Sequence, residues 1–378
     1  MNMLLLHGSS DLYGASKIFL QTAVMLSRKG HACHVILSAE GPLSQKLQQE
    51  GIPVSIVNLA VIRKKYYSVS GLVNRFMKFR SAAKAIKQLV REKNISLIYS
   101  NTTAVWVGAW VAKRTGVKHL WHVHEIIEKP WLLKRFIGYL LNGWANRSVV
   151  VSDAVLEHWK PMVRATKLVR VYNGISLEPA LDGDRERFRI KHNIPLDAQV
   201  LGMAGRVHYW KGQMEFLEIA KHMHKMRPEM HFVIAGDPYP GYEYLVDKMQ
   251  QYMRENDMHP YVHYIGFCDE MPAFYAAIDV FMLPSTGPDP FPTVILEAMH
   301  AAKPVICTIT GGAKEMVEKN ITGTYITTLF LEQAATLSLG AFDERIGPDY
   351  GKCGKERVEE YFTREAYEKN MLDVIETI

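Results

Sequence analysis

Two successive series of short apolar runs, separated by helical stretches, constrain the fold of this chain more than any other feature. The first series begins with an apolar run at residues 3–7, a helical stretch at 17–28 and another apolar run at 32–37. Strands that alternate with helices in this way form parallel sheets with right-handed crossovers. Further strands of this half are expected at 54–57, 95–99, 118–123, 148–151 and 168–171.

The second series repeats the pattern after a turn signal at 173–174 and a polar run, 178–189, that is typical of a linker. With 378 residues and 48% hydrophobic content, the chain can bury two cores. We therefore expect parallel α/β domains at 1–172 and 173–351, followed by an amphipathic helix at 352–378. The second domain has strands expected at 199–204, 230–235, 262–265, 278–283, 303–307 and 322–326, and helices at 213–226, 242–255 and 293–302.

Charge is distributed unevenly between the two halves. Residues 1–172 carry a formal charge of +17 and residues 173–378 carry −11. The region 61–93 contains aromatic residues and a single acid, Glu92, and a second mixture of cations and aromatics lies at 129–136. This pattern favours an anionic membrane surface as a partner over nucleic acid, for which no recognition motif is present. The ten cations of the first region are Arg63, Lys64, Lys65, Arg75, Lys78, Arg80, Lys84, Lys87, Arg91 and Lys93.

The remaining compositional features favour a cytoplasmic protein that is peripheral at the inner face of the membrane. No apolar stretch reaches the roughly 18 residues that a membrane span needs. The first residues show no basic leader or cleavage site of a signal peptide. Four widely separated cysteines are typical of free thiols in a reducing compartment.

The stretch from Asp289 to Glu297 is the strongest local signal for a binding site. Two carboxylates flank seven residues, and Pro292 is suited to the first position of a helix. The amides of Thr293 and Val294 would then point out of the helix N-terminus and form an anion site. Glu297, about one turn further on, would reach a neutral polyol. An anion beside hydroxyl groups indicates a nucleotide sugar as the ligand.

Several motifs together resemble the retaining GT-B glycosyltransferases of the large family 4, the glycosyl transferases group 1 type. In the first half the matching residues are Gly14, the segment 122–125, 151–152 and 172–175. In the second half they are 205–206 with 211–212, 265–267, 289–299, 303–306 and 311–315. The resemblance implies two Rossmann-like domains facing a cleft, with the C-terminal helix crossing back to the first domain. It also implies that the first domain takes the acceptor and the second binds the nucleotide sugar.

The resemblance assigns His124 and Asp289 as catalytic residues that face the transferred sugar. Asp289 departs from the family, which usually has Glu at this place. Arg206 and Lys211 could converge on one phosphate. A lone pair of this kind would be two solvated loop cations, but together with the helix N-terminus at Thr293 the pair favours a diphosphate. The residues expected to bind the donor are Gly14, Arg206, Lys211, Phe267, Phe291, Pro292, Thr293, Val294 and Glu297.

A metal site or another cofactor is not expected. Asp182 and Asp184 have the spacing of a metal-binding aspartate pair, but they lie in the polar run and follow no strand. His122 and His124 alternate along an expected strand and supply only two ligands. The negative charge on the leaving diphosphate would then be neutralised by fixed cations and amides.

The function expected is a retaining hexosyltransferase that moves a sugar from a nucleotide diphosphate sugar to a glycan acceptor. The acceptor is expected to be lipid-linked or part of a surface polysaccharide or lipopolysaccharide. One alternative with the same fold is a nucleotide-sugar epimerase or hydrolase, and another is a non-catalytic nucleotide-sugar or membrane-binding module. The sequence leaves open whether the nucleotide is UDP or GDP.

Overall fold

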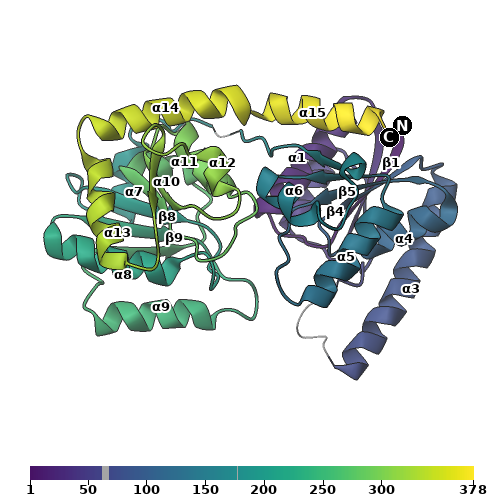
Figure 1. The fold of residues 1–378 in the computed structure, drawn as a ribbon, viewed down its shortest axis with the longest axis horizontal. Coiled ribbons are helices and arrows are strands. Elements are labelled where there is room, and N and C mark those ends of the chain that lie inside the picture. Colours follow the sequence, from purple (N-terminus) through teal and green to yellow (C-terminus); the bar gives the residue numbers. More distant parts are fainter. Residues whose placement is uncertain (62–67, 177) are drawn as a thin grey trace. The chain divides into compact units, whose positions relative to one another are not determined.

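The computed structural model describes residues 1–61, 68–176 and 178–378. The chain forms two compact units, one of Met1–Gly174 with Glu365–Ile378 and the other of Ile175–Arg364 (Figure 1). The first junction lies two residues after the boundary expected from the sequence. Each unit contains one parallel sheet covered by helices.

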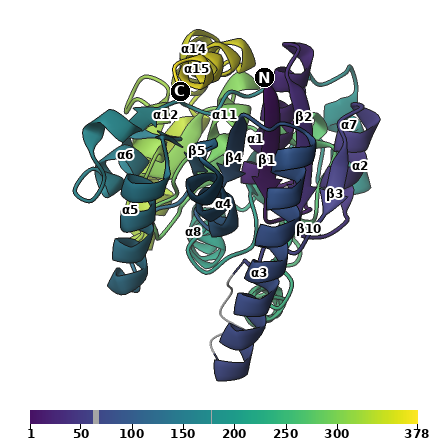
Figure 2. The same ribbon diagram turned by 90° about the vertical axis from the view of Figure 1, so that its right-hand side faces the viewer.

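The first unit is built on a seven-stranded parallel sheet with the order β3-β2-β1-β4-β5-β6-β7. Two apolar clusters cover it, one formed largely by α1 and the other by α3 and α4. Helix α4 lies between α3 and α5 (Figure 2). The strands are β1 (Asn2–His7), β2 (Ala32–Leu37), β3 (Val54–Ile56), β4 (Leu97–Asn101), β5 (Lys118–Val123), β6 (Arg147–Val150) and β7 (Leu168–Arg170). The helices are α1 (Gly14–Arg28), α2 (Pro42–Gln49), α3 (Val69–Glu92), α4 (Trp106–Thr115), α5 (Trp131–Trp144) and α6 (Asp153–Trp159).

The second unit has a six-stranded parallel sheet with the order β10-β9-β8-β11-β12-β13. All six strands lie within two residues of the expected positions. They are β8 (Val200–Ala204), β9 (His231–Ala235), β10 (Val262–Gly266), β11 (Val280–Leu283), β12 (Val305–Thr308) and β13 (Gly323–Ile326). The helices are α7 (Asp184–Lys191), α8 (Gln213–Met226), α9 (Tyr244–Glu255), α10 (Met271–Ala277), α11 (Thr293–His300), α12 (Ala313–Met316), α13 (Leu331–Ser338) and α14 (Ile346–Tyr361).

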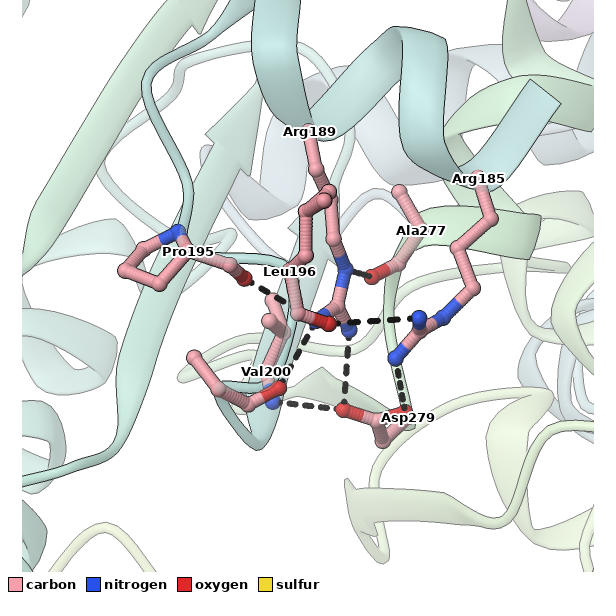
Figure 3. Close-up of polar contacts among 8 residues, drawn as sticks. Arg185, Arg189, Pro195, Leu196, Val200, Ala277 and Asp279 are labelled. Atoms are coloured by element: carbon pink, nitrogen blue, oxygen red, sulfur yellow. Dashed lines mark hydrogen bonds and ion pairs between the residues drawn. The ribbon is translucent and has the colours of Figure 1, made fainter. Parts of the chain in front are cut away.

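The polar run at 178–189 is not a linker, because its second half forms helix α7. Arg189 is fully buried, and its guanidinium donates to the carbonyl oxygen of Ala277 at 2.9 Å (Figure 3). It also donates to the carbonyl oxygen of Ala198 at 2.8 Å. The guanidinium also donates to the carboxylate of Asp279 at 3.2 Å. The same carboxylate accepts a hydrogen bond from the amide of Val200 at 2.7 Å. Arg189 therefore fastens α7 to the amino ends of β8 and β11, a role that a charged residue in a polar run does not reveal.

The C-terminal segment forms two helices instead of the single helix expected at 352–378. Helix α14 ends at Tyr361, and α15 (Arg364–Glu376) follows after two residues. The segment Glu365–Ile378 belongs to the first unit, so the chain returns to the domain in which it began. Tyr367 is buried in that unit, and its hydroxyl is hydrogen-bonded to the hydroxyl of Thr22 on α1.

Candidate functional site

The residues expected to bind the donor gather at the carboxyl edge of the second sheet. Arg206 and Lys211 follow β8, Phe267 follows β10, and Asp289 follows β11. This edge is where parallel α/β sheets bind their ligands, next to the point where the strand order reverses. Here the reversal falls between β8 and β11.

Lys211 and Asp289 form an ion pair in this part of the molecule. The ammonium group of Lys211 contacts Oδ2 of Asp289, and the two side chains are only 15% and 8% exposed. The sequence predicted separate roles for them, Lys211 at the diphosphate and Asp289 at the sugar. The structure brings this cation and this carboxylate together, although they lie 78 residues apart in the chain.

Glycines hold the backbone close to both members of this pair. Gly311 has φ +56°, and a Cβ atom there would lie 2.0 Å from the carbonyl oxygen of Asp289. That oxygen also accepts the amide of Gly312 at 2.8 Å. On the other side, Gly212 has φ +88°, and its Cβ would lie 2.0 Å from the carbonyl oxygen of Pro284. Because a side chain fits at neither place, these positions require glycine.

Helix α11 places its first amides at the same edge. It begins at Thr293, and Pro292 is the N-cap residue instead of the first helical residue that the sequence predicted. The N–H groups of Thr293 and Val294 lie in the first turn and have no acceptor within the helix. Phe291, just before the cap, is buried. The start of α11 is thus a helix N-terminus suited to an anion.

Glu297 is held in place by Thr293 and by Tyr275, which sequence reasoning did not identify. Its Oε2 lies 3.1 Å from the hydroxyl of Tyr275, and its Oε1 lies 3.4 Å from the hydroxyl of Thr293. Tyr275 is fully buried on α10, and burial together with the Glu297 carboxylate raises its pKa well above the usual range. The hydroxyl therefore remains protonated and can donate to Glu297. A tyrosine in an apolar helix gives no sequence signal of this contact.

Two further residues of the expected donor site are Arg206, which contacts an aromatic ring, and Phe267, whose own ring is exposed. The guanidinium of Arg206 lies 3.7 Å from the centre of the Tyr239 ring, so it is stacked on an aromatic face. Phe267 is 55% exposed at the end of β10 and directly follows Gly266, which has φ +67°. An exposed phenyl ring at this edge can stack on a flat ligand group.

His124 belongs to a polar network at the carboxyl edge of the first sheet. Its Nε2 lies 2.8 Å from Oδ1 of Asn101, whose amide nitrogen contacts Nδ1 of His7 at 3.0 Å and the carbonyl oxygen of Ala15 at 3.2 Å. The side-chain NH2 group of Asn101 donates to Ala15, so the side-chain oxygen of Asn101 is the atom that faces His124. His124 must therefore carry its hydrogen on Nε2 in order to donate to that oxygen. Nδ1 of His124 is then left as a hydrogen-bond acceptor.

The histidines of this network are neutral near pH 7. Burial lowers the pKa of His7 to about 4 and that of His122 to about 3. Burial, with His122 and His7 nearby, also lowers the pKa of His124 well below 6.5. Sequence reasoning missed Asn101, because Ser100 and Asn101 interrupt the apolar run and the strand was expected to end at Tyr99.

Glu125, the residue after His124, organises the backbone of the same loop. Its carboxylate accepts the amide of Thr103 at 3.0 and 3.1 Å and the amide of His124 at 3.1 Å. Burial raises the pKa of Glu125 to about 6, and these hydrogen bonds oppose the rise. The residue is therefore tied to neighbouring loops, which orients His124.

Gly14 precedes the helix expected at 17–28, but in the structure it is the first residue of α1. It is exposed, and a Cβ atom added there would meet nothing within 4 Å. The carboxylate of Asp11, three residues before Gly14, accepts a hydrogen bond from the hydroxyl of Ser16 at 2.8 Å. The same Ser16 oxygen lies 2.9 Å from Nε2 of His7. The start of α1 is thereby joined to the histidine network.

The basic region of the first half presents apolar side chains to solvent. Val73, Phe76 and Met77 on α3 are 53 to 60% exposed, and Trp131 and Leu132 on α5 are 58 and 66% exposed. The predicted cations Arg63, Lys64 and Lys65 and the aromatics Tyr66 and Tyr67 lie outside the described residues. None of the helices in the described part of the chain has the length and apolar character needed to cross a bilayer.

No metal-binding cluster of three or more ligands is present among the residues that the structure describes. Asp184 is the first residue of α7, where one carboxylate oxygen accepts the amide of Leu181 at 2.6 Å and the other pairs with Arg187. The aspartate pair at 182 and 184 therefore belongs to a helix start.

Two family models together match most of the chain. Residues 13–179 match the model described as Glycosyltransferase Family 4, and residues 184–336 match the one described as Glycosyl transferases group 1. The solved structure of HepE from Anabaena, in complex with UDP and glucose, covers 100% of both chains with a TM-score of 0.88 and 22% identity. This likeness and the two parallel sheets identify the fold as GT-B.

Curated relatives match parts of the chain at lower coverage. A lipopolysaccharide 1,2-N-acetylglucosaminetransferase of Salmonella typhimurium is 29% identical over 47% of this chain and 48% of that protein. A UDP-Gal:alpha-D-GlcNAc-diphosphoundecaprenol alpha-1,3-galactosyltransferase of Escherichia coli is 23% identical over 82% of this chain and 80% of that protein. The chain spans about half the length of several curated relatives that it matches.

Proposed function

The chain belongs to the group 1 glycosyltransferases, and we propose that it transfers a sugar from a nucleotide diphosphate sugar to a glycan acceptor. The observation that carries this proposal is the second unit's carboxyl edge. There the largely buried ion pair of Lys211 with Asp289 lies at the edge where α11 begins, four residues after Asp289. Cations, open amides and a carboxylate are the groups that a diphosphate joined to a sugar requires.

Donor binding exchanges the partners of this ion pair. The diphosphate attracts Lys211, Arg206 and the first amides of α11, because each can neutralise or hydrogen-bond its oxygens. Asp289 is then free to accept hydrogen bonds from hydroxyls of the transferred sugar. Glu297, oriented by Tyr275, accepts hydrogen bonds from the ribose.

The reaction proceeds with retention at the anomeric carbon. The acceptor hydroxyl attacks this carbon from the face that the diphosphate leaves. The bond between the anomeric carbon and the diphosphate oxygen breaks, and the proton of the hydroxyl passes to a leaving phosphate oxygen. Arg206, Lys211 and the amides stabilise the charge that develops on the diphosphate, without an obligatory metal. Neutral His124 accepts a hydrogen bond at Nδ1 from a sugar hydroxyl.

The acceptor is lipid-linked or part of a surface polysaccharide or lipopolysaccharide. Support comes from the relatives, whose names refer to lipopolysaccharide and to a diphosphoundecaprenol acceptor. The exposed apolar residues of α3 and α5 stand beside cations such as Lys78 and Arg135, a combination that binds anionic bilayers. We place the protein at the inner face of a membrane through this region.

A screen of nucleotide sugars tests the donor assignment. UDP- and GDP-linked sugars are added to the purified chain, and the true donor raises the thermal unfolding midpoint because it binds only the native state. The stabilising donor is then supplied with candidate acceptors, with and without EDTA, and the anomeric configuration of the product is read by NMR. Transfer that EDTA abolishes, or a product with inverted configuration, contradicts the corresponding part of the mechanism.

Vesicle flotation tests the membrane assignment separately. The protein should float with vesicles rich in anionic phosphatidylglycerol at low salt, and Phe76→Ser with Met77→Ser should reduce that fraction severalfold. Leu329→Ser is the matched control, because Leu329 is 81% exposed in the second unit. Equal flotation of the double variant and the wild-type protein would exclude α3 as the membrane contact.

A further inference from the structure

Six aromatic side chains from two loops and the start of helix α9 in the second unit form a cluster, which we call the aromatic platform. One loop follows β8 and the other follows β9, and the amide of Val207 donates to the carbonyl oxygen of Asp237 at 3.0 Å to join them. The ring of His208 lies at the centre, 4.2 Å from Tyr209 and 5.4 Å from Tyr242 between centroids. The members are His208, Tyr209, Trp210, Tyr239, Tyr242 and Tyr244.

Three tyrosines of the platform present their rings to solvent. Tyr209 is 62% exposed, Tyr244 57% and Tyr239 44%. A group of large exposed rings, held together by contacts with one another, is typical of a binding surface. The rings are also prearranged, because His208 contacts members of both loops and Tyr242 packs 6.1 Å from Tyr244.

The platform adjoins the proposed donor site on one side. Arg206 lies 3.7 Å above the ring of Tyr239, and the ammonium of Lys211 lies 4.8 Å from the centre of the Trp210 ring. The carbonyl oxygen of Trp210 accepts the amide of Thr286 at 2.9 Å, in the segment that leads to Asp289. A ligand lying on the platform would therefore extend from the place where the sugar is transferred.

The chemistry of the platform favours a neutral polyol. Its exposed rings are all tyrosines, whose faces stack on the C–H faces of a sugar while their hydroxyls bond its oxygens. The segment 236–244 contains Asp237 and Glu243 and no cation, which disfavours an anionic lipid or phosphate on that side. A single nucleobase would cover one ring, whereas three are exposed here.

We propose that the aromatic platform is a second glycan-binding surface, separate from the acceptor site that the resemblance assigns to the first domain. It holds a part of the acceptor's glycan chain away from the reacting end, with sugar rings stacked on Tyr209 and Tyr244. The identification of this glycan as the acceptor rests on the proposed function, whereas glycan binding itself does not. The substrate class is thus an oligosaccharide of several units instead of a lone lipid-linked monosaccharide. The platform would hold the chain while its end is extended.

Saturation-transfer NMR on the full-length protein tests the platform directly. Maltohexaose and chitohexaose serve as neutral glycan probes, and uridine serves as the nucleobase probe. At least one hexasaccharide should receive saturation, and Tyr209→Ala with Tyr244→Ala should weaken its binding at least about tenfold, since tyrosines are among the side chains whose truncation costs a binding surface most. The double Tyr→Phe variant should keep most of the affinity, because the ring faces remain. Tyr139→Ala, which removes a 66% exposed ring of the first unit, is the control.

The possible outcomes separate this inference from the proposed function. Absence of saturation on both hexasaccharides, or equal binding by the double alanine variant, overturns the inference. Loss of uridine binding in that variant, with glycan binding unchanged, assigns the platform to the nucleobase and also overturns it. If the platform binds glycan but no nucleotide sugar is consumed with any acceptor, the proposed function fails and glycan binding stands. Thermal stabilisation by UDP or GDP should be the same in the variant and the wild-type protein.

Discussion

Lys211 and Asp289 neutralise each other at the carboxyl edge of the second sheet, each almost withdrawn from solvent. Removing either side chain should destabilise the protein, because the remaining charge stays out of water and has lost its partner. The pair therefore stabilises the unliganded protein and also sets a condition for donor binding. A diphosphate must compete with Asp289 for Lys211.

The first prediction concerns this competition. Lys211→Ala should destabilise the unliganded protein by about 2 kcal/mol, the usual scale for a lost charged hydrogen bond, and should lower turnover by orders of magnitude. The double variant Lys211→Ala with Asp289→Ala should recover part of the stability but none of the activity. Denaturant unfolding measures the first effect, and a double-mutant cycle gives the coupling. Additive stability changes would show that the two side chains do not interact in solution.

The second prediction concerns the departure from the family at Asp289. Asp289→Glu adds a methylene where Asp289 is only 5% exposed and its backbone is packed against Gly311 and Gly312. The longer side chain would push the carboxylate toward the sugar, so we expect kcat to fall about tenfold for the native donor. The ratio of kcat/KM between epimeric sugar donors should also change. Asp289→Asn, which keeps the size and removes the charge, is the comparison that separates shape from electrostatics.

The sequence predicted the fold well because apolar periodicity reports burial directly. Each expected strand of the second unit was found within two residues, since runs such as 200–204 are buried on both faces. It failed at Arg189 and at Phe362, the residue after the last residue of α14, where the outcome depends on distant partners. A charged residue in a polar run does not show that five backbone and side-chain oxygens will surround it. Likewise, nothing local marks the break between α14 and α15.

The candidate site was predicted only in part, for a related reason. Arg206, Lys211, Asp289 and Glu297 could be placed at the carboxyl edge from their positions after strands or in a helix start. Tyr275, which shares no motif with Glu297, could not, because their hydrogen bond connects α10 to α11 through the fold. Contacts between side chains on different elements are fixed by packing, which spacing in the sequence does not record.

The third prediction follows from that contact. Tyr275→Phe keeps the buried ring and removes the hydroxyl that orients Glu297, so nucleotide binding should weaken about tenfold, or ~1.4 kcal/mol. KM for the donor should rise with kcat nearly unchanged, because the ribose contact is made in ground and transition states alike. Tyr325→Phe removes another tyrosine hydroxyl, bonded to the carbonyl oxygen of Val317, and is the control. Unaltered nucleotide affinity in Tyr275→Phe would show that Glu297 does not depend on this hydroxyl.

The fourth prediction is a dependence of stability on pH. Burial lowers the pKa of His7 and His263 to about 4 and of His119 and His122 to about 3, against 6.5 when exposed. The unfolded chain therefore binds more protons below pH 6.5. The free energy of unfolding that these histidines contribute should be fully present above pH 6.5 and should fall as the pH drops toward about 3.

Glu125 acts in the opposite direction over part of this range. Its pKa of about 6 lies above the ordinary 4.5, so the folded state binds its proton first between these values. Four histidines outweigh one carboxyl group, and the net loss on acidification should remain. Urea unfolding at several pH values measures the slope, and exposed His259→Gln should leave it unchanged. A stability that is constant from pH 7 to pH 4 would contradict burial of the neutral histidines.

The fifth prediction tests whether the glycine loop shapes the donor site. Gly311→Ala forces a Cβ atom to within 2.0 Å of the carbonyl oxygen of Asp289 at a φ of +56°, a conformation that L-residues rarely adopt. The loop must move, which displaces Asp289 and costs more than about 1 kcal/mol. We expect both a lower unfolding midpoint and loss of stabilisation by the donor. Gly340→Ala is the matched control, because its added methyl group meets nothing within 4 Å and its φ is not positive. If Gly311→Ala binds the donor as tightly as the control does, the backbone of Asp289 does not need to be held where the structure places it.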